Sequence, residues 1–545
     1  MKPVGSNMVR SAFCWGLFII FLLSGCSGDN EDGGSNSKPV TNLITTIFLS
    51  KEDNATATQL YGSTIEGASV VRLSENLVSG GNVVDFAISP DGRFVAYLAD
   101  QEEKGTFELY TVPVSGGTVI NVSRQTGTVL DVKEFAWAPN SSRIAFRAFN
   151  ALTGNTGGNI ELFTNTTGGN DLANVSNFLP VGANVETFKW SPKSQLIAYT
   201  ANTIRGSRQQ FRLWATPPNA DNQAFSISNI PASTNTYTIG EYQWSPDGLL
   251  IAFLADVKIL GTNELLATVA DINSTPTAIS GTLADGGEVV NFAWAPNNSR
   301  IAYLADQFTD EKFDLITVVP DVNSLNPRPD PLLLSRGILG DVVEFAWSPD
   351  SSRLAYIADG DTLRVFELYT NVPFGTSEFK ISGPLTPGGE VVAFAWSPDS
   401  KIIAYQASQD SANVFELFTS EPFSPINNTK ISGSPSAGGL PDSAGAFGWA
   451  PDGSRVAYIA RQATDYYELY SSTPDGLANN AVVSGPMVNG GNVDSFEWSP
   501  DSSRVAYLAD QDTINVRELY SSQSDGSGNL KISEGIVEEI YAWVP

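Results

Sequence analysis

The stretch EFAWSPDSSRLAYIAD, Glu344–Asp359, decides the fold, because eight close copies of it occur elsewhere in the 545-residue chain. The copies share a proline that returns every 49 to 54 residues, at positions 90, 139, 192, 246, 296, 349, 398, 451 and 500. A period of this length, made of short strand-like segments, is typical of propeller blades and not of helical solenoids.

Each repeat divides into four predicted β-strands, which in the sixth repeat are VVEFAWSP (342–349), SRLAYIAD (352–359), VFELYTNV (365–372) and EFKISGPL (378–385). Ser-Pro-Asp-Ser or Ser-Pro-Asp-Gly predicts a tight turn between the first two strands. Proline presets φ, aspartate can accept hydrogen bonds from the following amides, and glycine tolerates a positive φ. The second strand is apolar at nearly every residue, which predicts that neighbouring sheets cover both of its faces.

The tryptophans support stacked blades. Nine of the 11 tryptophans fall at one repeat position, two residues before the proline: Trp137, Trp190, Trp244, Trp294, Trp347, Trp396, Trp449, Trp498 and Trp543. A ligand-stacking aromatic residue would not need to recur in every unit, whereas a residue that fills the space between neighbouring sheets would. We therefore expect these indoles to lie in the core.

The two ends of the repeat array complement each other. The array starts with ITTIFLSK (44–51), TQLYGST (58–64) and SVVRLSE (69–75), which match a second, third and fourth strand without a first. It ends with EEIYAWVP (538–545), which matches a first strand alone. Pairing the last strand with the first sheet removes an open edge. The sequence thus predicts an all-β propeller of about ten four-stranded blades. Two smaller rings are the alternative, disfavoured because the only split blade spans the two termini.

The repeat also resembles a known family. Phe-Ala-Trp-Ser-Pro-Asp-Gly/Ser followed by Ile/Leu/Val-Ala-Tyr is similar to the WD40-like β-propeller repeat of TolB and of the propeller domains that precede prolyl-oligopeptidase-type hydrolases. The resemblance covers residues 43–545 and implies the fold, while it says little about activity. TolB departs from this pattern in having six blades and an additional N-terminal domain.

The first residues resemble a bacterial lipoprotein signal. Lys2 and Arg10 precede the apolar run AFCWGLFIIFLL (12–23), which is short for a membrane span. It leads into Leu-Ser-Gly-Cys (23–26), which resembles the lipoprotein box and implies lipidation of Cys26. We expect a signal peptide over 1–25, the lipidated cysteine and a flexible tether over 26–42, and the propeller over 43–545. Ser27 implies an anchor in the outer membrane, facing the periplasm or the cell surface. An ordinary signal peptide or an uncleaved anchor is the alternative.

Composition limits the function classes. The chain has no histidine, which excludes a Ser-His-Asp triad and a histidine-based metal site. Its net charge of −28 disfavours nucleic acid and anionic lipid. We expect a non-catalytic monomer without a cofactor that binds envelope proteins and meets the membrane through its N-terminal lipid only.

Acidic pairs recur between the second and third strands of five repeats: Asp100 with Glu108, Asp256 with Glu264, Asp306 with Asp314, Asp359 with Glu367, and Asp510 with Glu518. A hairpin places both members at the end of the blade that also carries the Gly-Gly loops. Such an acidic rim could bind partners or Ca²⁺, and paired carboxylates could serve a polysaccharide-binding protein or a glycosidase. The structural alternative is that the acids solvate hairpin ends or accept backbone hydrogen bonds. Lys51 and Gln59, Asn202 and Arg212, and Arg461 and Glu468 occupy the same positions in other repeats, which favours that alternative.

The third repeat is an outlier. Its hairpin carries Arg205, Arg208 and Arg212 where its neighbours carry acids, and Trp214 where they carry Tyr or Phe. A basic and aromatic notch in an acidic ring is a candidate partner site, and drift of a single blade is the alternative.

Overall fold

The computed structural model consists of β-strands joined by turns and loops. It describes residues 44–51, 57–64, 69–124, 130–151, 158–176, 179, 182–205, 208–219, 221, 223–228, 238–259, 261–272, 274–322, 330–375, 377–412, 414–433, 447–462, 465–478 and 480–545. Within these residues no helix is long and apolar enough to cross a membrane. The predicted signal peptide, Cys26 and the tether lie outside the described residues.

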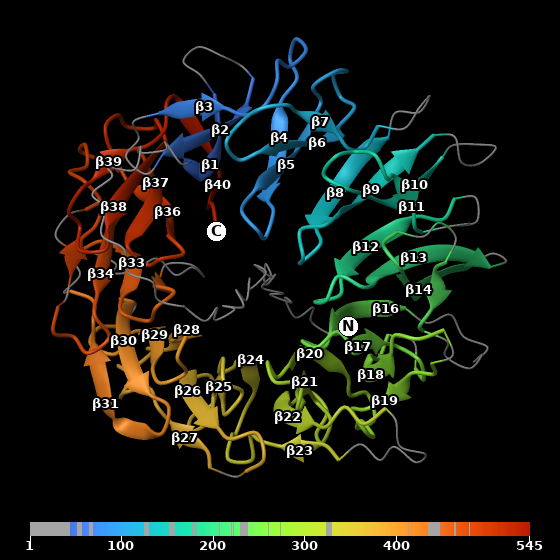
Figure 1. Cartoon of the computed structure of the whole chain (residues 1–545). Coiled ribbons are helices and arrows are strands. Elements are labelled where there is room, and N and C mark those ends of the chain that lie inside the picture. The colour runs from blue at the N-terminus through green and yellow to red at the C-terminus, as the bar shows by residue number, and fades with distance from the viewer. Residues whose placement is uncertain are drawn as a thin grey trace, which may run out of the picture. The chain divides into compact units, whose positions relative to one another are not determined.

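Ten four-stranded antiparallel sheets form a ten-bladed β-propeller, as the sequence predicts (Figure 1). Blades 1 to 9 follow the chain from β4 onward, and the closing blade combines the last strand with the first three. The first strands lie innermost: β4 (Val83–Ile88), β8 (Asp131–Trp137), β12 (Val185–Trp190), β16 (Ile239–Trp244), β20 (Val289–Trp294), β24 (Val342–Trp347), β28 (Val391–Trp396), β32 (Phe447–Trp449), β36 (Val493–Trp498) and β40 (Ile536–Trp543).

The second strands follow outward: β5 (Phe94–Ala99), β9 (Ile144–Asn150), β13 (Ile197–Arg205), β17 (Leu250–Ala255), β21 (Ile301–Ala305), β25 (Leu354–Ala358), β29 (Ile403–Ala407), β33 (Val456–Ala460), β37 (Arg504–Ala509) and β1 (Ile44–Lys51). The third strands are β6 (Glu108–Pro113), β10 (Asn159–Asn165), β14 (Arg208–Thr216), β18 (Glu264–Val269), β22 (Asp314–Val318), β26 (Glu367–Asn371), β30 (Glu416–Glu421), β34 (Glu468–Ser472), β38 (Glu518–Gln523) and β2 (Gln59–Thr64). The fourth strands lie on the perimeter: β7 (Ile120–Asn121), β11 (Ala173–Asn174), β15 (Phe225–Ser226), β19 (Thr277–Ala278), β23 (Leu332–Leu333), β27 (Phe379–Lys380), β31 (Ser424–Lys430), β35 (Ala481–Val482), β39 (Leu530–Lys531) and β3 (Val70–Arg72).

The closing strand β40 pairs antiparallel with β1, which confirms the predicted closure. Trp543 lies opposite Thr46 and Tyr541 opposite Phe48. A further backbone hydrogen bond runs from the amide of Val544 to the carbonyl of Thr45, at 2.8 Å. The chain therefore forms one ring and not two. Consecutive blades are connected by the polypeptide, and the ring closes through the non-covalent pairing of β40 with β1.

The core lies between blades. The second strands are buried on both faces, and β25 and β29 are buried at every residue. One core cluster joins Leu304 and Leu315 of blade 5 to Leu354 and Tyr356 of blade 6. Within a blade, an aromatic side chain of the second strand stacks on one of the third strand. The aromatic rings of Tyr356 and Tyr369, for example, have centroids 5.8 Å apart. Each blade thus depends on its neighbours for burial of its apolar faces.

The recurring tryptophans seal these interfaces, as predicted. Eight of the nine indoles donate a hydrogen bond to an inner-strand carbonyl of the preceding blade, for example Trp347 Nε1 to Ala293 O at 3.1 Å. Trp294 is the exception, since its buried Nε1 has no partner among the described residues. Blade 1 has Ile88 at this position, and it packs in one cluster with Ala542 and Val544 of the closing strand.

The turns between first and second strands also link the blades. Their fourth residue has a positive φ, and where it is serine or asparagine its side chain accepts a hydrogen bond from the turn of the preceding blade. The six pairs are Asp91 with Ser141, Asn140 with Ser194, Asp247 with Asn298, Asn297 with Ser351, Asp350 with Ser400, and Asp452 with Ser502. Glycine at the fourth position, as at Gly248, adopts this φ without strain but provides no acceptor. Serine and glycine are therefore not equivalent in the turn.

Candidate functional site

The predicted acidic pairs lie where the sequence places them. Each aspartate follows a second strand, each partner acid opens the third strand, and Ala99 pairs with Glu108 in the ladder. The Gly-Gly loop meets them at the same end of the blade, since a Cβ on Gly81 would lie 2.6 Å from the carbonyl oxygen of Asp100. Nine of the ten acids are buried, and Asp510 is half-buried. The acids do not form an exposed rim.

The aspartates connect two loops of their own blade. One carboxylate oxygen of Asp359 accepts a hydrogen bond from the amide of Asp341, at 2.5 Å, just before the first strand. The other accepts from the amide of Arg364, at 2.8 Å, in the loop before the third strand. Asp100, Asp256, Asp306 and Asp510 make the same two contacts. In blade 3 the neutral Asn202 accepts the first of them, from Asn184 at 2.5 Å. The position therefore needs an acceptor and not a charge.

The partner acids are engaged within the blade as well. Glu367 accepts hydrogen bonds from the hydroxyl of Tyr369 at 3.1 Å and from Lys380 Nζ at 3.0 Å. Glu518 has the same two kinds of partner in Tyr520 and Lys531. Lys258 pairs with Glu264 and Lys312 with Asp314. Burial raises the pKa of Asp314, against the opposing effects of Ser335 and Lys312.

These contacts account for the recurrence of the acidic pairs without a ligand. Buried carboxylates that accept backbone amides stabilise the loops at that end of each blade. In the part of the chain that the structure describes, no group of three or more Cys, Asp or Glu is arranged to hold a metal ion. Binding of a partner, a glycan or Ca²⁺ by these residues stays a prediction, and the geometry favours the structural alternative.

Among the strands that the structure describes, those of the basic hairpin of blade 3 are the longest. Strands β13 and β14 pair from Ile197 with Thr216 to Arg205 with Arg208, whereas β12 follows β13 only to Ala201. The outer end of the hairpin therefore pairs only with itself among the described residues. Trp214 stacks on Tyr199 at 6.5 Å, as tyrosine and phenylalanine do in other blades.

Trp214 thus belongs to the core of blade 3 and does not form an exposed notch. Its buried Nε1 has no partner among the described atoms. Arg212 is half-buried opposite Ala201, and the side chains of Arg205 and Arg208 lie outside the described residues. A partner site on this hairpin remains a prediction.

A surface that the sequence analysis missed lies at the turns between third and fourth strands. Blades 4 to 8 each expose one large apolar side chain there, between 48% and 86% of its surface: Ile272, Val319, Phe374, Phe423 and Leu477. We call these five residues the apolar arc. The corresponding turns of blades 1, 2, 3 and 9 carry Ser115, Thr167, Asn219 and Asp525. The signal in the sequence is an apolar residue inside a turn, which the strand pattern does not require.

The arc is held firmly. Thr317 donates its hydroxyl to the carbonyl of Pro373 at 3.1 Å, across the interface between blades 5 and 6. Thr419 does the same to Pro474, at 2.7 Å, across the interface between blades 7 and 8. Arg300 lies 4.9 Å from the ring centroid of Phe374, and Arg353 lies 5.6 Å from that of Phe423. The exposed rings are therefore presented by fixed turns.

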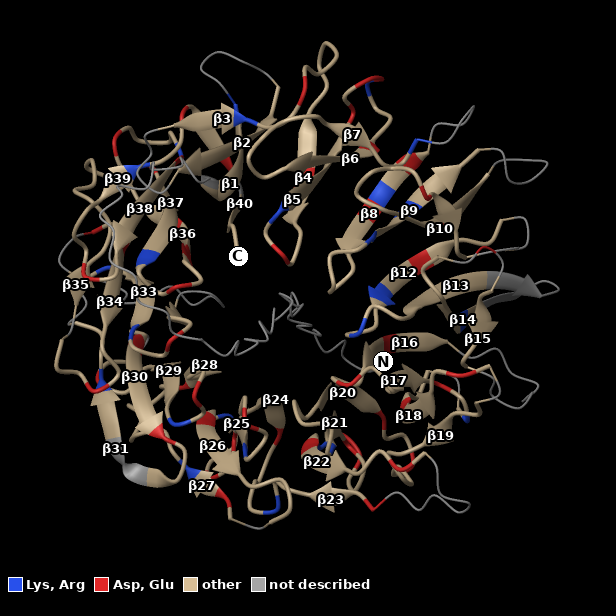
Figure 2. Ribbon diagram, in the orientation of Figure 1, with Lys and Arg blue, Asp and Glu red and all other residues tan. Residues whose placement is uncertain are grey.

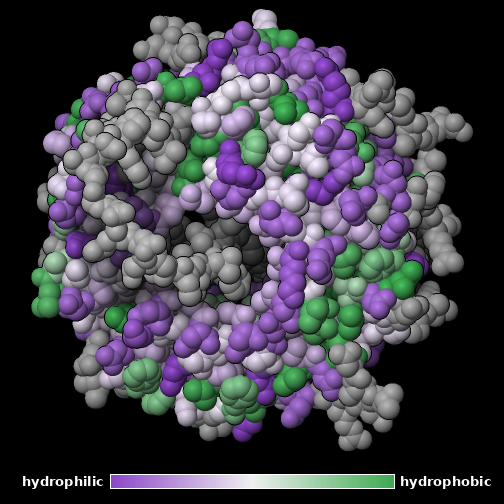
Figure 3. All heavy atoms as spheres, in the orientation of Figure 1, coloured by the Kyte–Doolittle hydropathy of each residue, from purple (hydrophilic) through white to green (hydrophobic). Residues whose placement is uncertain are grey.

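The centre of the ring is predominantly acidic. A bulge in most inner strands leaves two consecutive residues exposed, as at Val84 and Asp85. Figure 2 shows charges of both signs on inner strands such as β8 and β12, and in Figure 3 the ring is hollowed at its centre. Among the inner-strand side chains that the structure describes, the charged ones are Asp85, Asp131, Glu134, Glu186, Glu241, Glu344, Asp494, Glu497 and Glu538, with Lys133 and Lys189. Burial raises the pKa of Asp85 and of Glu344, and raises that of Glu497 to about 7.

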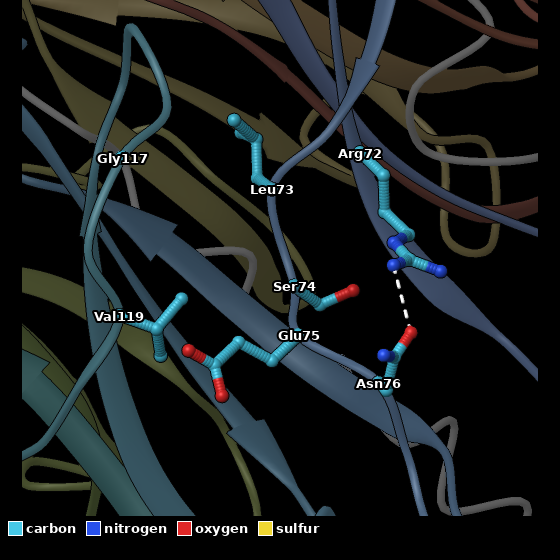
Figure 4. Close-up of a pocket in the computed structure, with 7 residues that line it drawn as sticks. All are labelled: Arg72, Leu73, Ser74, Glu75, Asn76, Gly117 and Val119. Carbon is cyan, nitrogen blue, oxygen red and sulfur yellow. Dashed lines mark hydrogen bonds between the residues drawn. The ribbon is translucent and has the colours of Figure 1, made fainter.

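One cavity of about 310 Å³ lies between the closing blade and blade 1 (Figure 4). Arg72, Leu73, Ser74, Glu75 and Asn76 line it from one side, and Gly117 and Val119 from the other. The guanidinium of Arg72 donates to Asn76 Oδ1 at 2.9 Å. The hydroxyl of Ser74 is engaged, because it donates to Gln59 Oε1 and accepts from the amide of Leu60. The cavity lacks an activated nucleophile among these residues.

No family model matches the chain. No characterised protein matches it by sequence either. Solved structures are similar to it only at low identity and with low TM-scores. A eukaryotic initiation factor is 12% identical with a TM-score of 0.48, over 92% of this chain and 98% of that one. TolB from Acinetobacter baumannii is 15% identical with a TM-score of 0.27, over 67% and 82%. Dipeptidyl peptidase 4 from Porphyromonas gingivalis is 14% identical with a TM-score of 0.42, over 64% and 53%.

Proposed function

We propose that the chain is a non-catalytic, lipid-anchored protein of the bacterial cell envelope that binds other envelope proteins through its propeller. The observation that carries this proposal is the apolar arc. Five consecutive blades expose large apolar side chains on their outer turns, and hydrogen bonds from the preceding blade fix the turns of blades 6 and 8. Rigid exposed aromatic residues next to arginine are the composition typical of the energetic centre of protein interfaces.

The contacts that the recurrent carboxylates make support a binding role over an enzymatic one. The recurrent Asp and Glu residues are engaged by backbone amides, tyrosines and lysines of their own blades. The chain also has no histidine to act as a general base. The acidic surface charge disfavours nucleic acid as the partner.

Affinity capture from envelopes of the source bacterium tests the proposal. The bait is the full chain, compared with the double variant Phe374→Ser, Phe423→Ser. The matched control is Leu363→Ser, Ile514→Ser, because these residues are equally exposed at the opposite end of their blades. We expect the same proteins to be recovered with wild type and control and at least about ten-fold less with the arc variant, the effect of losing about 1.4 kcal/mol. Equal recovery by all three baits would refute the role of the arc.

The anchor is tested separately. Cys26→Ser should release the protein from the membrane fraction, and mass spectrometry of the N-terminus should find an acylated cysteine in wild type. An unmodified N-terminus elsewhere in the chain would contradict the lipid anchor and leave the binding role open.

A further inference from the structure

One position of the inner strands carries a different kind of residue in three blades than in the other seven. The residue immediately before the recurring tryptophan position is alanine or glycine in seven blades: Ala87, Ala136, Ala293, Ala346, Ala395, Gly448 and Ala542. In the other three blades a long polar side chain replaces it: Lys189, Gln243 and Glu497.

Two of these side chains make the same contact. Lys189 Nζ donates to the carbonyl of Tyr242 in blade 4, at 2.8 Å. Gln243 Nε2 donates to the carbonyl of Phe292 in blade 5, at 3.0 Å. Both acceptors lie two residues before the tryptophan of their own blade. A donor at this position therefore reaches a fixed backbone carbonyl across the blade interface.

The interface between blade 9 and the closing blade repeats the one between blades 3 and 4. Trp543 Nε1 lies 3.1 Å from the carbonyl of Glu497, just as Trp244 Nε1 lies 3.1 Å from that of Lys189. The hydroxyl of Tyr541 lies 3.2 Å from Ser495 Oγ, and that of Tyr242 lies 3.2 Å from Thr187 Oγ1. The carbonyl that corresponds to Tyr242 O is therefore that of Tyr541, in the closing strand.

We propose that Glu497 is a proton-dependent latch on the closing strand β40. On acidification the carboxylate takes one proton from solvent, and the resulting carboxylic acid donates a hydrogen bond to the carbonyl of Tyr541, as Gln243 does to Phe292. The ionised carboxylate has no hydrogen to donate and faces the carbonyl oxygen with a negative charge. The ring therefore closes more firmly when Glu497 is neutral.

The groups around Glu497 are compatible with a change in its protonation. Part of the Glu497 side chain is open to solvent at the inner edge of blade 9, so protons reach it, while the protein around the rest of the side chain desolvates the carboxylate and raises its pKa to about 7. It lies opposite Ala506 of β37, and the strand packed against it contributes the phenol of Tyr541, whose pKa burial raises further above its ordinary value. Of the other charged groups described on these elements, Asp494 pairs with Arg517, Glu538 pairs with Lys51, and Arg504 donates to Ser521 and Gly528. No ion pair to Glu497 occurs among the described residues.

The sign of the pH effect follows from the raised pKa. The folded protein binds this proton more tightly than the unfolded chain, whose glutamate has its ordinary pKa of 4.5. The contribution to stability is therefore complete below about pH 4.5 and is lost as the pH rises through about 7.

Hydrogen exchange of the full chain at pH 5 to 8, corrected for the intrinsic rate, tests the latch on the amides that β40 and β1 share. Local opening of β40 leaves Glu497 in place on β36 and breaks only its bond to Tyr541, so wild type should lose about five-fold protection as the pH rises past 7, the effect of one hydrogen bond. Glu497→Gln and Glu497→Lys copy Gln243 and Lys189 and should keep full protection throughout. Glu497→Ala copies the other blades and should be independent of pH but about five-fold less protected than Glu497→Gln.

The control is Glu344→Gln, another inner-strand glutamate with a pKa raised by burial, but one that lies three residues before its tryptophan instead of one. It should retain the pH dependence of wild type. Equal protection in Glu497→Ala and Glu497→Gln would overturn the latch, since the donated bond would then be absent. A pH dependence that survives in Glu497→Gln would overturn it as well.

Discussion

Removal of the last eight residues, 538–545, tests ring closure directly. The truncation deletes Trp543, of which 6% is exposed, together with its hydrogen bond to Glu497. It also removes the pairing of β40 with Thr46, Ile47 and Phe48 and the hydrogen bond from Val544 to Thr45. Loss of a buried indole costs about 3 to 5 kcal/mol and each net backbone hydrogen bond about 1 kcal/mol, so the free energy of unfolding should fall by about 6 to 9 kcal/mol.

Such a loss is comparable to the whole stability of many domains. We expect the truncated chain to unfold at a much lower denaturant concentration, followed by tryptophan fluorescence, and to associate through its open blade edge in size-exclusion chromatography. Trp347→Ala is the matched control, because it removes an equivalent indole from a strand that stays covalently tied to its blade. It should lose only about 3 to 5 kcal/mol and remain monomeric. A truncated protein that unfolds together with the intact chain would refute closure by β40.

Three further predictions concern the loops and turns. Asp359→Ala should lower the free energy of unfolding by about 2 to 4 kcal/mol, because the amides of Asp341 and Arg364 lose their acceptor. Asp359→Asn keeps an acceptor and should cost about half as much. Equal costs of the two variants in calorimetry would mean that the charge of Asp359 matters. Ser400→Ala should lower the free energy of unfolding by about 1 kcal/mol, because it loses the hydrogen bond from Asp350 while residue 400 keeps its positive φ. Ser400→Gly should be nearly neutral, because relief of the strain at that φ offsets the lost bond. Equal denaturation midpoints for the two variants would contradict the hydrogen bond between the turns. Ca²⁺ and chelator should leave the melting temperature unchanged, because the recurrent aspartates already accept backbone amides, and a rise with Ca²⁺ would restore the cation site.

The sequence alone determined the ring. The tryptophan before nearly every turn between first and second strands, the apolar second strand and the blade split between Ile44–Lys51 and Ile536–Trp543 are local patterns, and they specify strand faces, turn chemistry and strand order. These patterns work because burial and turn geometry depend on residues close to one another in the chain.

Tertiary structure decided which side chains meet. Asp359 connects two loops, Ser351 accepts a bond from a turn 54 residues away, and Lys189 and Gln243 each reach a backbone carbonyl of the next blade. Trp214, which the sequence places in a basic notch, packs on Tyr199, and the apolar arc exists because successive turns meet on one side of the ring. Such contacts depend on how twisted sheets stack, which fixes the register between residues about 50 positions apart and is not encoded in any single repeat.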